Sequence, residues 1–111
     1  MLFRSDDAYK SYLAGEIIPS INPNTIADGL LTSLGKRNFP IIMSYVKEIV
    51  TVSEDSIIKA MKLIYERMKI IIEPSSAVTL AALIENKVKA KGSNIGLIIS
   101  GGNVDLSKLP F

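Results

Sequence analysis

Apolar residues recur at helical spacing through the middle of the chain. Intervals of four, three and four residues separate the members of this run, which are Ile57, Met61, Ile64 and Met68. That spacing places them on one face of a helix, with the charged residues largely off that face. Ser53 precedes the run and is a residue type that commonly caps helix N-termini, so the pattern predicts a long helix that begins after Ser53.

Capping residues predict two shorter helices in the first half of the chain. Ser5 can cap a helix whose first turn carries Asp6 and Asp7, because acidic groups suit the positive end of a helix dipole. Gly15 is the residue type that ends such a helix. Pro40 suits the first turn of a second helix, which leads toward the middle of the chain.

A fourth helix is predicted after Pro74, which follows three consecutive isoleucines and interrupts the pattern of the long helix. Small and apolar residues then return at helical spacing, so this helix should pack closely against a neighbour. Gly92 is expected to close it. The residues that define its packing face are Ala77, Leu80, Ala81, Ile84 and Val88.

Two short apolar runs predict strands, at residues 49–52 and 95–99. A strand, two helices and a second strand form a right-handed crossover that covers one face of a parallel sheet. The expected class is therefore α/β, with a partial parallel sheet covered by helices. Because two strands do not complete such a sheet, we expect the segment to belong to a larger domain.

Ser100, Gly101, Gly102 and Asn103 follow the second predicted strand directly. The carboxyl end of a parallel strand is where open α/β sheets place their ligands. Glycines permit positive φ and a close approach of backbone N–H groups, and Ser100 and Asn103 offer neutral hydrogen-bonding groups. A ligand-binding turn and a plain connecting turn both fit these four residues.

Composition narrows the chemistry further. The sequence contains no Cys and no His, which excludes disulfides, thiol nucleophiles, Ser-His-Asp triads and zinc sites built on those ligands. A net charge of +2 with scattered basic residues argues against nucleic acid. The 48% hydrophobic content indicates a packed core, yet no apolar run approaches the ~18 residues that span a membrane. We expect a cytoplasmic protein with one domain and no membrane partner.

Seven short segments together resemble the C-terminal part of the fold type II pyridoxal-phosphate enzymes, specifically the serine racemase and serine/threonine dehydratase family. The resemblance runs from Asp6 to Leu106, and it implies the large domain of a tryptophan synthase β-like fold over residues 6–111. Residues 1–5 match nothing in the family and are expected to be a non-family start. The matching segments are residues 6–9, 25–29, 39–42, 50–55, 66–69, 73–77 and 100–103.

The resemblance also implies that part of the active site is not in this sequence. In the family, a lysine in the N-terminal portion forms a Schiff base with pyridoxal phosphate, and a glycine-rich loop there binds its phosphate. Neither motif occurs here, so no catalytic residue is assigned. We expect the chain to be a C-terminal fragment and to be inactive alone.

Four residues correspond to the family's cofactor site. Ser100 matches the serine that hydrogen-bonds the pyridine nitrogen, and Gly101 follows it in the same turn. Gly29 matches a glycine whose backbone lines the cofactor pocket. Glu73 matches an acid near the ring, although an acid ahead of Pro74 at a helix entry fits that position equally well.

The resemblance extends to the activators of serine racemases. Asp7 matches a carboxylate that binds Mg²⁺ or Ca²⁺ together with the backbone carbonyl of Ser5. Because the family's other carboxylate has no counterpart, we expect weak or no metal binding, with Asp7 acting as a helix acid. Lys69 and Asn103 match residues that contact ATP at a subunit interface. For Lys69, a solvated surface lysine is the better interpretation. For Asn103, a turn residue and a nucleotide contact fit equally well.

The favoured function is thus part of a pyridoxal-phosphate dependent racemase or ammonia-lyase (dehydratase) that acts on serine, threonine or a related hydroxy amino acid. It would abstract the Cα proton and lead to racemisation or β-elimination, and the intact enzyme would be a homodimer. The alternative is a non-catalytic α/β module that binds a small anionic ligand at the Ser100–Asn103 turn or assembles with a partner chain.

Overall fold

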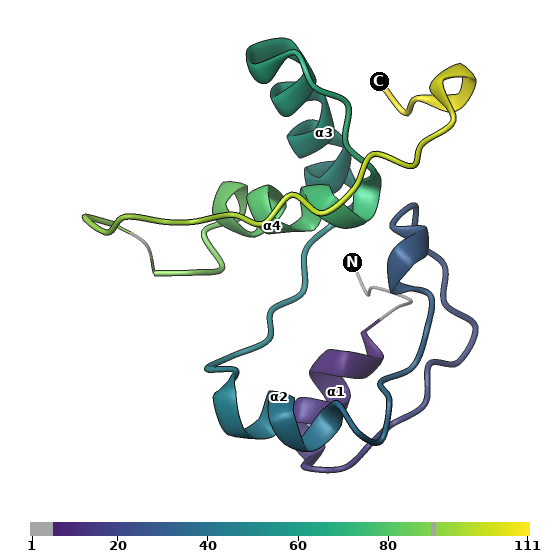
Figure 1. Cartoon of the computed structure of the whole chain (residues 1–111), viewed down its shortest axis with the longest axis vertical. Coiled ribbons are helices and arrows are strands. Elements are labelled where there is room, and N and C mark those ends of the chain that lie inside the picture. The colour runs from purple at the N-terminus through teal and green to yellow at the C-terminus, as the bar shows by residue number, and fades with distance from the viewer. Residues whose placement is uncertain (1–5, 90) are drawn as a thin grey trace.

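The fold, in a computed structural model that describes residues 6–89 and 91–111, is built from helices joined by extended and irregular chain. Figure 1 shows α1 and α2 in one part and α3 and α4 crossing in the other, with residues 46–53 joining the two parts. The elements are α1 (Asp7–Ala14), the 3-10 turn η1 (Asp28–Leu30), α2 (Phe39–Tyr45), α3 (Glu54–Met68), α4 (Pro74–Ile84) and the 3-10 turn η2 (Leu106–Lys108). No helix within the described ranges has both the length and the apolar character needed to cross a membrane.

Helix α3 confirms the long helix predicted from the apolar spacing. It begins after Ser53, whose side chain accepts a hydrogen bond from the Ser56 N–H at the helix N-terminus. Three of the four residues of the predicted face are buried, but Met68 is 57% exposed. Figure 1 gives the reason, because α4 crosses the first turns of α3 and does not reach its last turn.

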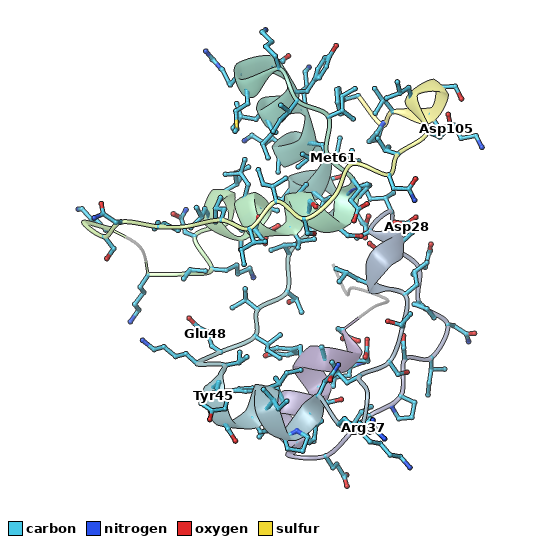
Figure 2. All side chains as sticks on the ribbon, viewed as in Figure 1. Asp28, Arg37, Tyr45, Glu48, Met61 and Asp105 are labelled. Atoms are coloured by element: carbon cyan, nitrogen blue, oxygen red, sulfur yellow. The ribbon has the colours of Figure 1, made fainter. Side chains whose placement is uncertain are left out.

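The hydrophobic core lies where α3 crosses α4. Small side chains of α4, including the fully buried Ala77 and Ala81, let the two helices approach closely. Figure 2 shows Met61 inside this part, whereas Tyr45, Glu48 and Arg37 point outward from the part that contains α2. The buried apolar residues of the core are Ala27, Val52, Ile57, Ala60, Met61, Ile64, Ile72, Ala77, Ala81 and Ala82.

A polar contact ties the start of α3 to the end of α4. The Glu85 carboxylate accepts hydrogen bonds from the Ser53 hydroxyl at 2.5 Å and the Ser53 N–H at 2.7 Å. Burial alone would raise the pKa of Glu85, but the hydrogen bonds from Ser53 and Ser56 and the charge of Lys87 hold that pKa below its ordinary value. The ionised form of Glu85 is therefore the form that joins the two helices.

Helix α4 ends earlier than its apolar pattern predicts. The sequence predicts continuation to Gly92, but Asn86 adopts a left-handed conformation with φ 54°. The Asn86 N–H donates to the carbonyl of Leu83, and the Lys87 N–H donates to that of Ala82, both at 3.0 Å. This pair of bonds is the Schellman termination, whose left-handed position is usually Gly and sometimes Asn.

The part with α1 and α2 is organised by polar contacts. Gly15 ends α1 with φ 73°, and Pro40 lies in the first turn of α2, both as predicted. Ser5 lies outside the described residues, and Asp6 precedes the helix without a side-chain capping bond. The fully buried Ser11 hydroxyl accepts the Ile18 N–H at 2.8 Å and donates to its carbonyl at 3.3 Å.

The two predicted strands are not confirmed. Residues 49–52 and 95–99 are extended, but no strand forms in the described part of the chain, and so the partial parallel sheet is not established by the structure. Residues 95–99 lie at the surface, with Ile98 79% exposed. A strand requires a neighbour with a matching row of backbone hydrogen bonds. Beside residues 95–99, one backbone hydrogen bond, from the Glu73 N–H to the Gly101 carbonyl at 3.0 Å, joins the turn at Ser100 to the segment that leads into α4.

Candidate functional site

The first turn of α4 brings together three segments that are far apart in the sequence. Pro74 occupies the first turn of the helix, where its missing N–H costs no hydrogen bond, and Glu73 precedes it as the N-cap residue. The side chains of this turn hold the 3-10 turn η1 on one side and the turn at Ser100 on the other. We call the resulting group the α4 cluster; it consists of Gly29, Glu73, Ser75, Ser76, Ser100 and Gly101.

Ser76 holds the turn that the sequence singles out. Its oxygen Oγ accepts the N–H groups of Ser100 at 3.1 Å and Gly101 at 3.0 Å. The same Oγ lies 3.2 Å from the Ser100 hydroxyl and 3.2 Å from the Gly101 carbonyl oxygen. Ser76 is 2% exposed, whereas Ser100 is exposed, so a buried serine anchors an exposed one.

Ser75 makes the corresponding contact to Gly29. Its Oγ accepts the Gly29 N–H at 2.9 Å, and the Asp28 carboxylate accepts the same N–H at 2.8 Å. A Cβ added at Gly29 would meet the Ser75 Oγ at 2.7 Å, which is closer than side chains pack. The absence of a side chain at Gly29 is therefore what allows η1 to approach the first turn of α4.

Glu73 spans the opposite side of the Ser100 turn. Its Oε2 accepts the Asn103 N–H at 3.2 Å, and its carboxylate atoms lie 2.9–3.0 Å from the position of a Cβ at Gly101. A carboxylate in this place takes up a backbone donor and repels a second negative group. This geometry argues against the alternative of an anion bound at the Ser100–Asn103 turn.

The two glycines serve close packing at this turn. We expected them to permit positive φ, but the positive-φ glycines are Gly15 and Gly92. A Cβ at Gly102 would lie 2.9 Å from the Ile71 carbonyl oxygen, a backbone atom that cannot swing away. Gly102 therefore lets the chain pass directly beside the segment that leads into α4.

Lys69 and Asn103, the predicted nucleotide contacts, lie on these two adjacent segments. Lys69 ends α3 in a left-handed conformation with φ 60°, and its Nζ donates to the Glu66 carbonyl at 2.7 Å. Both residues are exposed. The Lys69 ammonium thus caps the last turn of α3, where a positive charge complements the helix dipole.

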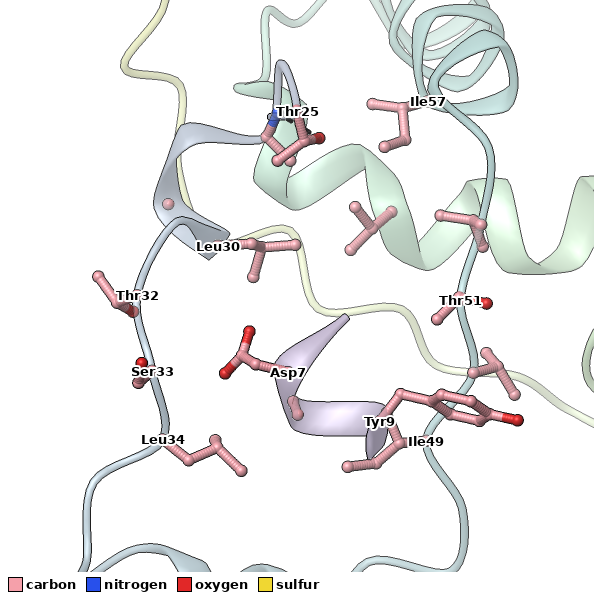
Figure 3. A pocket seen from close by; sticks show the side chains of 16 residues that line it. Asp7, Tyr9, Thr25, Leu30, Thr32, Ser33, Leu34, Ile49, Thr51 and Ile57 are labelled. Atoms are coloured by element: carbon pink, nitrogen blue, oxygen red, sulfur yellow. Dashed lines mark hydrogen bonds between the residues drawn. The ribbon is translucent and has the colours of Figure 1, made fainter. Parts of the chain in front are cut away.

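Asp7 lines a cavity of about 280 Å³, which Gly29 of the α4 cluster also lines. It belongs to the first turn of α1, as predicted, but it is only 5% exposed and its Oδ2 is buried without a hydrogen-bond partner. Figure 3 shows the carboxylate facing the segment that carries Thr32 and Ser33, with Thr51 across the cavity. In this fold, Asp7 is therefore a buried acid and not a solvated one.

Asp7 is one of the two predicted metal ligands. Within residues 6–89 and 91–111, no three Asp, Glu, His or Cys side chains gather closely enough to hold a metal ion. Ser5, the other predicted ligand, lies outside the described residues. Mg²⁺ and Ca²⁺ take about six or more oxygen ligands, so Asp7 would need further oxygen ligands to hold either ion, and the expected weak or absent metal binding stays a prediction.

Comparison with known proteins identifies the family. Residues 4–101 match the family model described as pyridoxal-phosphate dependent enzyme. The chain belongs to this family. Its match to the family model includes every residue of the α4 cluster, which therefore lies in a part of the chain that pyridoxal-phosphate dependent enzymes share.

Individual members of the family match nearly the whole of this chain. Serine racemase from Dictyostelium discoideum is 55% identical over 109 residues, covering 95% of this chain and 34% of the relative. The beta-hydroxyaspartate dehydratase of Paracoccus denitrificans (strain Pd 1222) is 46% identical over 108 residues, covering 97% of this chain and 34% of the relative. The crystal structure of a T.th. threonine deaminase superposes with a TM-score of 0.87 at 41% identity, over 95% of this chain and 39% of that one. The chain spans about a third of the length of these relatives.

Ser75 and Ser76 are the site residues that sequence reasoning missed. They lie within the matched segment at residues 73–77, but only Glu73 was assigned a role there. A usable signal was present, because serines in the first turn of a helix are well placed to accept backbone N–H groups. What the sequence did not indicate is that those N–H groups belong to Gly29, Ser100 and Gly101.

Proposed function

We propose that this chain forms one side of the cofactor site in a pyridoxal-phosphate dependent racemase or dehydratase. The α4 cluster carries this proposal, since three of the residues with predicted cofactor roles, Gly29, Ser100 and Gly101, are held by the adjacent serines Ser75 and Ser76. Glu73, the fourth, precedes the same turn. The residues with predicted cofactor roles therefore gather around the start of one helix, which supports a shared ligand site.

Each residue of the cluster has a distinct part in this proposal. Pyridoxal phosphate, when bound, supplies an electron sink for the bonds at the substrate Cα. Ser100 offers the pyridine nitrogen a neutral hydroxyl, which can donate a hydrogen bond but cannot fix a full proton there as a carboxylic acid would. Gly29 contributes a backbone edge, and Glu73 keeps the turn in place through the Asn103 N–H.

The relatives point to the substrate class. Their names describe action on serine, beta-hydroxyaspartate and threonine, which all carry a hydroxyl on Cβ. We infer a substrate of this class, handled by removal of the Cα proton followed by its return or by loss of the β-hydroxyl. The correspondence of Asp7 and Ser5 to metal ligands, with weak or no cation binding in this chain, that of Lys69 and Asn103 to ATP contacts, and assembly as a homodimer remain predictions.

A hybrid enzyme tests the proposal. The part of the Dictyostelium racemase that precedes the matched third is joined to residues 6–111 of this chain and supplied with pyridoxal phosphate and L-serine. We expect visible absorption from bound cofactor together with D-serine or pyruvate. Ser100→Ala should weaken cofactor binding or turnover by roughly a few-fold to a hundred-fold, because a buried ring nitrogen loses a hydrogen bond.

Two controls make the result interpretable. Ser44→Ala removes an exposed serine on α2 and should leave cofactor binding and turnover unchanged. The chain alone should form no product above the free-cofactor background, because every lysine in it is exposed and lies outside the α4 cluster. A folded hybrid, shown by circular dichroism and a monodisperse elution profile, that binds no cofactor would contradict the proposal.

A further inference from the structure

We propose that Ser76 is a positioning residue that leaves the Ser100 hydroxyl proton available to a ligand. This inference rests on the proposed function for its ligand, pyridoxal phosphate, but its geometry stands on the contacts of Ser76 alone. A single buried oxygen, Ser76 Oγ, lies within 3.2 Å of the N–H and Oγ of Ser100 and of the N–H and carbonyl oxygen of Gly101.

The hydrogen-bonding capacity of Ser76 decides where the protons lie. A serine hydroxyl has one donor and two acceptor positions. The Ser100 N–H at 3.1 Å and the Gly101 N–H at 3.0 Å fill both acceptor positions of Ser76. Its own proton goes to the Gly101 carbonyl or to the Ser100 Oγ, which lie equally far away at 3.2 Å. Under either choice, Ser100 cannot donate to Ser76.

The consequence is a defined polarity for Ser100. Because Ser76 has no acceptor position left, the Ser100 proton can be donated outward, and Ser100 is exposed whereas Ser76 is 2% exposed. Ser100 therefore acts as a donor toward an acceptor such as an unprotonated pyridine nitrogen. Ser76 contributes twice: it fixes the backbone of the Ser100 turn, and it blocks the competing direction of the Ser100 hydroxyl.

Amide exchange in this chain tests the geometry without any cofactor. In Ser76→Ala, the N–H groups of Ser100 and Gly101 lose their buried acceptor, and their hydrogen exchange, followed by NMR, should speed up by about tenfold. Ser76→Thr keeps the hydroxyl and should restore most of the protection. The Asn103 N–H, which Glu73 accepts, should change little in either variant.

Ser75→Ala is the matched control, because it removes the neighbouring hydroxyl from the same helical turn. It should speed exchange at Gly29 and leave Ser100 and Gly101 protected. If Ser75→Ala and Ser76→Ala affected the same amides, the effect would be a general loosening of α4, and the positioning role would be overturned. Unprotected Ser100 and Gly101 amides in the unchanged chain would overturn it as well.

The hybrid enzyme tests the consequence for the ligand. Ser76→Ala should weaken retention of pyridoxal phosphate by about three- to tenfold and alter the visible absorption spectrum of the bound cofactor and its pH dependence in the same direction as Ser100→Ala. Ser76→Thr should restore the spectrum. A double variant that is no worse than Ser100→Ala alone would show that Ser76 acts through Ser100.

The outcomes separate this inference from the proposed function. A hybrid in which Ser100→Ala alters the cofactor spectrum but Ser76→Ala does not would overturn the role of Ser76 and leave the function standing. A folded hybrid that binds no cofactor would overturn the function, and the ligand role of Ser76 with it, even where the amide exchange in this chain behaves as expected.

Discussion

The two parts of this molecule bury opposite kinds of residue. Helices α3 and α4 bury mainly apolar side chains, including Ile57, Met61 and Ile64, in a continuous core. Helix α1 buries only Asp7 and Ser11, and α2 buries none of its residues. A hydrophobic core holds the first pair, whereas hydrogen bonds from side chains to backbone hold the second, so the two parts should respond differently to substitution.

Removal of core volume should give the largest effect and should be confined to the α3–α4 part. Ile57→Ala removes a side chain that is 1% exposed and should lower the free energy of unfolding by about 2–5 kcal/mol. Ile41→Ala, on α2 at 58% exposure, should change it by less than about 0.5 kcal/mol. Urea unfolding followed by far-UV circular dichroism measures both. Equal losses would mean that the α1–α2 part has a core of its own.

Loss of a buried hydroxyl should give the next largest effect, this time in the α1–α2 part. Ser11→Ala leaves both backbone groups of Ile18 without their partner and should cost about 1–3 kcal/mol locally. The expected readout is faster hydrogen exchange of the Ile18 amide. Ser44→Ala, which removes an exposed hydroxyl from α2, should have no comparable effect. An unchanged Ile18 amide would show that Ser11 does not hold this loop.

The smallest effect concerns the polar contact inside the apolar part. Because the pKa of Glu85 lies below its ordinary value of 4.5 in the folded chain, its ionised form stabilises the fold above that pH. The contribution should fall away as the pH drops from about 4.5 through the lower folded pKa. Glu85→Gln should remove this pH dependence and cost about 1 kcal/mol near pH 7. Thermal unfolding between pH 3 and 7 measures this pH dependence of stability. Glu66→Gln is the control for loss of one exposed carboxylate. A pH profile of stability that is the same in Glu85→Gln as in the unchanged chain would count against the contact with Ser53.

Prediction from sequence succeeded where one segment carries its own signal. Ser53 caps α3, Gly15 ends α1 and Pro40 enters α2, because each acts on backbone groups within a few residues. It failed at the end of α4, where Asn86 competes with an apolar pattern that continues to Val88. The strands predicted at residues 49–52 and 95–99 were not confirmed, since an apolar run does not specify a partner for its backbone hydrogen bonds.

The candidate site, too, could be predicted from the sequence only in part. The motifs around Glu73 and Ser100 were recognisable from their residues and their order, and the family match confirms the family that they indicate. The burial of Asp7 was not predicted, because an acid in the first turn of a helix is usually solvated. The contacts of Ser75 and Ser76 were not predicted either, because their hydrogen-bond partners lie in other segments of the chain.

The sequence by itself determined the helical face of α3, most of the helix ends and the family to which the chain belongs, since all of these depend on neighbouring residues or on short ordered motifs. Only the tertiary structure decided that Ser76 accepts the N–H of a residue 24 positions away, and that Glu85 meets Ser53 across 32 positions. Hydrogen bonds require their two atoms to lie within about 3 Å, and the path of the chain, which no local pattern encodes, brings those atoms together.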